Sequence, residues 1–190
     1  VEDALRLGGV GAEEDITDNP ITTSKKRFLW LFINLLTAVL ASWVIGIFDL
    51  TIQKVVALAI LMPIVASQGG NAATQTLAVT IQLIASQQLT FKNVAKIINR
   101  EIVTGLLNGI IFAFITGLFV YFWFDDLRIS AIIGVAMIIN LTAAGLAGIG
   151  IPVFMHKIKI DPAVSAGVFI TTVTDCCGYA SFLGIAKMFL

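Results

Sequence analysis

Apolar residues fall into five long runs that are separated by short polar connectors. The runs cover residues 28–48, 55–85, 102–124, 129–155 and 163–190. A transmembrane helix needs about 20 consecutive, predominantly apolar residues to cross the hydrocarbon core of a bilayer. The pattern therefore predicts an all-α, polytopic membrane protein with five transmembrane helices in each chain.

Prolines and glycines indicate where these helices break or begin. The second run is longer than one simple span and contains Pro63 and the sequence Ser-Gln-Gly-Gly-Asn at 67–71. Its length is compatible with one long helix or with two half-helices. Asp161 followed by Pro162 predicts the start of the fifth helix, with the aspartate as N-cap and the proline at the first helical position.

The composition indicates that lipid surrounds most of the chain. Of the 190 residues, 58% are hydrophobic and 13% are charged, whereas ordinary soluble domains are about 45–50% apolar and about 25% charged. The mean hydropathy is +0.96. The net charge is zero, so the chain lacks the overall basic charge typical of nucleic-acid partners.

Basic residues gather in alternate connectors. The connectors before the second and fourth runs hold only Lys54 and Arg128. The basic residues before the first, third and fifth runs are Lys25, Lys26, Arg27, Lys92, Lys96, Arg100, Lys157 and Lys159. By the positive-inside rule, the chain is a multi-pass protein of the cell membrane with a cytoplasmic amino terminus.

Residues 1–24 differ from the rest of the chain. They hold six acidic residues against the single Arg6, together with Gly-Gly and Asn-Pro pairs that disfavour a long helix. We interpret 1–24 as a cytoplasmic lead-in or linker and 25–190 as a five-helix transmembrane pore domain. An acidic patch that senses divalent cations is the alternative for the first segment. The chain shows no signal peptide, and its start at Val1 suggests a fragment.

Small residues recur at helical spacing in the third and fourth runs. Such spacing is typical of faces on which membrane helices approach each other closely. The prediction is therefore that both faces pack against other helices, although Asn140 could instead hydrogen-bond a pore helix. The residues are Gly105, Gly109, Ala113 and Gly117 in the third run, and Asn140, Ala144 and Gly148 in the fourth.

A polar stripe follows one side of the second run. Its members are Ser67, Asn71, Thr74, Gln75 and Gln82. Polar side chains within a span either bond neighbouring helices or line a hydrated path. The spacing leaves both interpretations open.

Asp175 is the one acidic residue deep inside an apolar run. It shares a helical face with Thr171, Thr174 and Gly178. An aspartate at the centre of a transmembrane helix costs about 2.5–3.5 kcal/mol on insertion scales, so it usually faces a cavity or a partner. A bound divalent cation is the favoured explanation, and a protonated or helix-capping carboxyl is the alternative.

A hard cation such as Mg²⁺ suits this face, because it prefers oxygen ligands and keeps much of its hydration shell. One aspartate per chain supplies little charge, but a twofold dimer would bring two together. An intramembrane enzyme is disfavoured, because one interfacial His156 and one deep aspartate supply no paired carboxylates, serine–histidine pair or zinc ligands.

Two segments of the chain carry distinctive motifs. They are residues 63–76, Pro-Ile-Val-Ala-Ser-Gln-Gly-Gly-Asn-Ala-Ala-Thr-Gln-Thr, and Asp-Pro-Ala at 161–163 followed by Thr-Thr-Val-Thr-Asp at 171–175. Both resemble the transmembrane domain of the MgtE family of magnesium channels and transporters. Shorter similarities occur at 34–37 and 140–141. The resemblance covers roughly residues 20 to 190.

The resemblance implies a homodimer with five helices per subunit and a pore at the twofold interface, through which hydrated Mg²⁺ crosses the bilayer. It implies that Asp175 and the main-chain carbonyl of Thr171 hold the ion. The pore-lining residues that we expect are Ser67, Asn71, Thr74, Leu77 and Thr174.

Two further expectations concern transport and regulation. An ion-coupled secondary transporter of divalent cations, Mg²⁺ or another, is the alternative function, suggested by the possible break in the second run. Family members usually carry cytosolic N and CBS domains ahead of the membrane part, and residues 1–24 would match only the end of the linker that follows those domains.

Overall fold

The structure is a computed structural model that describes residues 19–89 and 93–190. The part of the chain that it describes forms helices and no strands. The acidic residues of the predicted lead-in all lie within 1–18, outside the described residues. The helices are α2 (Pro20–Gly46), α3 (Asp49–Lys54), α4 (Ala57–Ala85), α5 (Val94–Phe124), α6 (Leu127–Lys157) and α7 (Pro162–Phe189).

Short polar side chains cap the starts of three long helices. The Asp161 carboxylate accepts a hydrogen bond from the Ala163 amide at 2.9 Å, with Pro162 as the first residue of α7. This confirms the predicted N-cap. Asn19 and Pro20 start α2 in the same way, so residues 20–24 belong to this helix. Asp126 caps α6 by accepting from the Arg128 amide at 2.7 Å.

The second apolar run forms one helix, not two halves. α4 runs without interruption through Pro63 and the glycine pair at 69–70, and the short helix α3 precedes it. Among the described residues, four helices are long and apolar enough to cross a membrane, namely α2, α5, α6 and α7. α4 matches them in length, but its amide and hydroxyl side chains lower its hydropathy. The expected count of five spans therefore stays a prediction.

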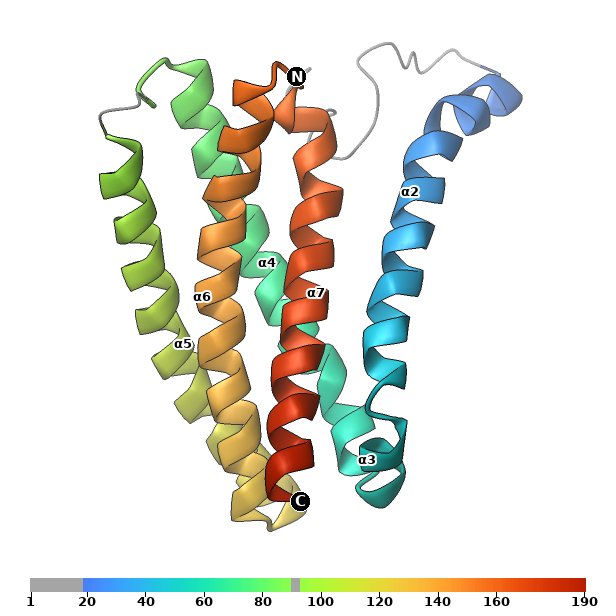
Figure 1. The fold of residues 1–190 in the computed structure, drawn as a ribbon, viewed down its shortest axis with the longest axis vertical. Coiled ribbons are helices and arrows are strands. Elements are labelled where there is room, and N and C mark those ends of the chain that lie inside the picture. The colour runs from blue at the N-terminus through green and yellow to red at the C-terminus, as the bar shows by residue number, and fades with distance from the viewer. Residues whose placement is uncertain (1–18, 90–92) are drawn as a thin grey trace.

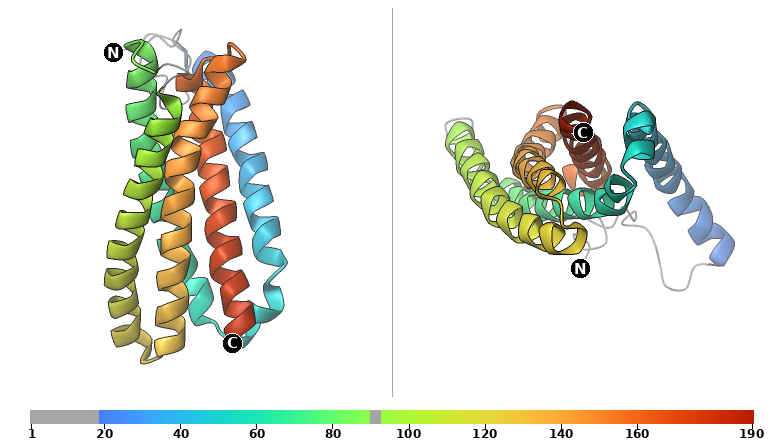
Figure 2. Two further views of the ribbon diagram at one scale, coloured as in Figure 1. Left: turned by 60° about the vertical axis from the view of Figure 1, so that its left-hand side comes forward. Right: turned by 90° about the horizontal axis from the view of Figure 1, so that it is seen from below.

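α6 lies at the centre of the helix bundle and packs against α4, α5 and α7. Figures 1 and 2 show α5 and α2 at opposite ends of the arrangement, with α4 crossing obliquely behind α6 and α7. α2 contacts the rest mainly through α7. The start of α2, the end of α4, the start of α5 and the 157–162 connection lie at one end of the molecule, at the top in Figure 1.

Small residues bring α5 and α6 together, as the spacing predicts. A Cβ added at Gly105 would lie 2.7 Å from the Leu141 carbonyl oxygen, and one at Gly109 would lie 2.8 Å from the Ile138 Cα. At the other end of the interface, the Ser130 hydroxyl donates to the Gly117 carbonyl at 2.6 Å. Only glycine permits such close backbone contact, so the packing interpretation of this face is confirmed.

Candidate functional site

Asp175 lies near the middle of α7 with its side chain half-buried. Within the part of the chain that the structure describes, its carboxylate forms no hydrogen bond and no ion pair. A carboxylate within a membrane helix normally faces a partner or a cavity. Asp175 therefore has its full ligand capacity available for a group outside the single chain.

The two threonines that precede Asp175 on this face bond to their own helix. The Thr171 hydroxyl donates to the carbonyls of Gly167 at 3.1 Å and Val168 at 3.0 Å. The Thr174 hydroxyl donates to the Thr171 carbonyl at 3.0 Å, and its side chain is fully buried. Inside α7 the Thr171 carbonyl, the predicted cation ligand, is also the acceptor position for the helical bond from the Asp175 amide, so a cation bound there would have to replace or share the Thr174 hydroxyl bond.

The polar stripe of α4 is exposed along the outside of the single chain. Its members Ser67, Asn71, Thr74, Gln75 and Gln82 are all exposed. Leu77, in contrast, is 2% exposed and packs inside the bundle. Of the predicted pore-lining residues, three thus lie on an open face, whereas Leu77 and Thr174 are enclosed by the chain's own helices.

Asn140 joins α4, α6 and α7 near the centre of the bundle. Its side chain is 0% exposed, and its amide group donates to the Val65 carbonyl at 2.8 Å. Gly69 and Gly178 flank it so closely that a Cβ at either would clash with the Asn140 amide nitrogen. Among the described residues, the Asn140 side-chain oxygen is the one buried side-chain polar atom without a partner. Asn140 thus both packs between helices and hydrogen-bonds α4, the helix that carries the polar stripe.

Replacing Asn140 by Ala should lower the free energy of unfolding by about 1 kcal/mol, the usual net contribution of one hydrogen bond. The loss stays modest because the substitution also removes the unsatisfied oxygen. Thermal melting of the detergent-solubilised protein measures the change. Asn34→Ala is the control: Asn34 is exposed and bonds only to the Trp30 carbonyl of its own helix, so its effect should lie within about 0.5 kcal/mol. Equal melting temperatures for the two variants would contradict the prediction.

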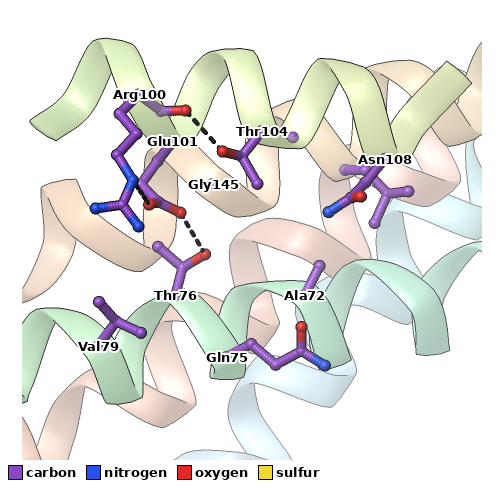
Figure 3. A pocket seen from close by; sticks show the side chains of 11 residues that line it. Ala72, Gln75, Thr76, Val79, Arg100, Glu101, Thr104, Asn108 and Gly145 are labelled. Atoms are coloured by element: carbon purple, nitrogen blue, oxygen red, sulfur yellow. Dashed lines mark hydrogen bonds and ion pairs between the residues drawn. The ribbon is translucent and has the colours of Figure 1, made fainter.

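A polar groove lies between α4, α5 and α6 (Figure 3). Its volume is about 200 Å³. The Thr76 hydroxyl on α4 donates to the Glu101 carboxylate on α5 at 3.3 Å, and the Arg100 guanidinium lies 3.8 Å from the other carboxylate oxygen. Gln75 and Asn108 lie further along the groove on its α4 and α5 walls.

Sequence reasoning missed Glu101, because the third apolar run was taken to begin at residue 102. The helix itself begins at Val94, which places Glu101 about two turns inside it. A signal was present: Arg100, Thr104 and Asn108 recur every four residues on one side of α5.

No group of three or more His, Cys, Asp or Glu side chains comes together within the described residues. A cation at Asp175 would therefore need oxygen ligands from backbone carbonyls, water or a second chain. Mg²⁺ suits such a set, since it is commonly bound by one or two carboxylates and keeps several waters.

Comparison with known proteins identifies the family. The family model for MgtE, described as a divalent cation transporter, matches residues 62–185. The chain belongs to the MgtE family. The matched region runs from α4 to near the end of α7, so it includes the polar stripe, the Glu101 groove and Asp175.

Three curated relatives support the assignment to the MgtE family. The magnesium transporter MgtE of Enterococcus faecalis is 33% identical over 184 residues, which are 97% of this chain and 40% of the relative. The magnesium transporters MgtE of Bacillus subtilis and Thermus thermophilus are 27% and 26% identical over the whole chain, and the match covers 42% of each relative. The chain thus spans about two fifths of the length of these relatives.

Proposed function

We propose that this chain moves Mg²⁺ across a membrane, with Asp175 as the charged group that holds the ion. The observation that carries the proposal is a half-buried carboxylate in the middle of a candidate span, in a family whose curated members are named magnesium transporters. The Thr171 carbonyl, one turn earlier on α7, is the second proposed ligand. Both are oxygen donors, the kind that Mg²⁺ selects.

The exposed face of α4 supplies the rest of the proposed path. Ser67, Asn71 and Thr74 lie on this face, and polar side chains are unfavourable against lipid. Contact with water and with a second copy of the chain removes that cost. The pore would then lie at a twofold interface, where two Asp175 side chains could share one hydrated ion. Leu77 and Thr174 would support the wall from inside the bundle.

The proposed location is the cell membrane, with the amino terminus cytoplasmic. The basic residues at 25–27, near the start of α2, and at 157–159, at the end of α6, lie at the same end of the molecule. Five spans, with α4 as the second, would put this end in the cytoplasm by the positive-inside rule.

The test is Mg²⁺ uptake by liposomes that contain the purified 190-residue chain and enclose a Mg²⁺-sensitive dye. The expected result is uptake that follows the Mg²⁺ gradient and needs no other ion gradient. Uptake no faster than in protein-free liposomes, for Mg²⁺ or any other divalent cation, would contradict transport. Uphill uptake driven by a proton or Na⁺ gradient would instead support the alternative, an ion-coupled transporter. That alternative was suggested by a possible break in the second apolar run, and α4 is continuous there.

A further inference from the structure

Glu101 is a second carboxylate within a candidate span, and the proposed path along α7 does not use it. α5 holds it inside the bundle, because Gly145 of α6 packs against its backbone: a Cβ at Gly145 would lie 2.8 Å from the Glu101 carbonyl oxygen. α4 has far fewer contacts with α5 than with α6. The close α5–α6 contact and the loose α4–α5 contact leave the polar groove open between α4 and α5.

The Glu101 carboxylate keeps unused capacity to accept ligands. Its side chain is 13% exposed, and the Thr76 hydroxyl is its one hydrogen-bond donor among the described residues. An ionised carboxylate offers about four lone-pair sites. The contact with Arg100 is long, and the Arg100 side chain is 71% exposed. A long contact with a solvent-exposed guanidinium contributes little, so a cation in the groove can compete with Arg100.

Besides Glu101 and Arg100, the polar side chains that line the groove are neutral and carry oxygen atoms. Gln75, Thr104 and Asn108 line it together with Thr76. Hard divalent cations prefer carboxylate, carbonyl, hydroxyl and water oxygens. A cavity of about 200 Å³ has room for a cation with several waters, since one water occupies about 30 Å³ of the liquid.

We propose that this groove is a second divalent-cation site, in which the Glu101 carboxylate and the neighbouring hydroxyl and amide oxygens hold a hydrated ion. None of its lining residues belongs to α7, so the site is distinct from Asp175. The inference rests on the proposed function only for the choice of a divalent cation. Gln75 belongs both to the groove and to the exposed stripe of α4.

Mn²⁺ binding to the detergent-solubilised 190-residue chain tests this site. Mn²⁺ accepts the same oxygen ligands as Mg²⁺, and the electron paramagnetic resonance signal of free Mn²⁺ reports how much is bound. Glu101→Gln keeps the shape of the side chain and removes its charge. It should lower the Mn²⁺ bound at saturation by about one ion per chain. The matched control is Asp125→Asn, at the exposed carboxyl end of α5, which should bind as much as the wild type.

Identical Mn²⁺ titrations for Glu101→Gln and Asp125→Asn would overturn the proposal. Asp175→Asn separates this inference from the proposed function. This variant should lose the Mn²⁺ bound at Asp175 and keep the Mn²⁺ bound at the Glu101 groove. No loss in Asp175→Asn would contradict the Asp175 site alone.

If Glu101→Gln does not fold, a second variant tests the proposed cation site. Asn108→Leu changes an exposed side chain at the rim of the groove and leaves the Thr76–Glu101 contact in place. It should raise the Mn²⁺ dissociation constant of the groove at least threefold. An unchanged dissociation constant would overturn the proposal, because a purely structural Glu101 would not respond to Asn108.

Discussion

Asp175→Asn is expected to lower the initial rate of Mg²⁺ uptake by liposomes roughly tenfold or more, which corresponds to at least about 1.4 kcal/mol in the transport barrier. The asparagine has nearly the same shape, so the change isolates the negative charge. Among the described residues, no group of three or more His, Cys, Asp or Glu side chains forms a metal site that could replace it. The dye assay in liposomes measures the rate, and Mn²⁺, Co²⁺ and Ca²⁺ tested in parallel measure the ion preference.

Two controls make the Asp175 result interpretable. Asp125→Asn is the same substitution at an exposed helix end, where the backbone of residue 125 is left-handed, a conformation that asparagine tolerates. It should leave the uptake rate unchanged. Asp175→Asn should melt at the same temperature as the wild type or higher, because removing a charge from a membrane helix removes an insertion cost. Uptake by Asp175→Asn at the wild-type rate, with unchanged preference for Mg²⁺, would refute the assignment.

Gly145→Ala and Gly150→Ala are expected to change stability in opposite directions, although both lie in α6. A methyl group at 145 would meet the backbone of α5 at Glu101, whereas one at 150 would meet nothing within 4 Å. Overpacking a close contact costs about 1–3 kcal/mol. An exposed helical glycine replaced by alanine gains about 0.5–1 kcal/mol.

Thermal melting of the two glycine variants in the same detergent measures this difference. A change of 1 kcal/mol shifts the melting temperature of a domain of this size by about 2–4 °C. Gly145→Ala should therefore melt several degrees below the wild type and Gly150→Ala slightly above it. Equal shifts of the same sign would show that the α5–α6 backbones are not held together as the structure has them.

The small-residue face of α5 was predictable because its cause is local and periodic. Residues four apart share one side of a helix, so Gly105 and Gly109 could be assigned to a packing face before any partner was known. Which backbone they contact was not predictable. That depends on the rotation and offset of α6, which the sequence pattern of α5 does not contain.

Residues of α4 and α7 that lie close together in sequence differ in burial. The resemblance implies that Asn71 and Leu77 both line a pore, and within the single chain Asn71 lies on the open face and Leu77 inside the bundle. On α7, Thr174 and Asp175 are neighbours in sequence, yet Thr174 is fully buried and Asp175 only half-buried. Burial is set by the helices packed alongside, and spacing on one helix cannot give it.

The sequence by itself determined that the chain is helical and suited to lipid, that its last helix starts at Asp161 and Pro162, and that Asp175 is a charge deep in an apolar helix. Hydrophobic runs, N-caps and the cost of a charge in a membrane act within one segment, so they can be read along the chain. Only the tertiary structure decided that Asn140 bonds to Val65 and that Glu101 faces Thr76 across a groove. These contacts join residues far apart in the sequence, and the packing of whole helices brings them together.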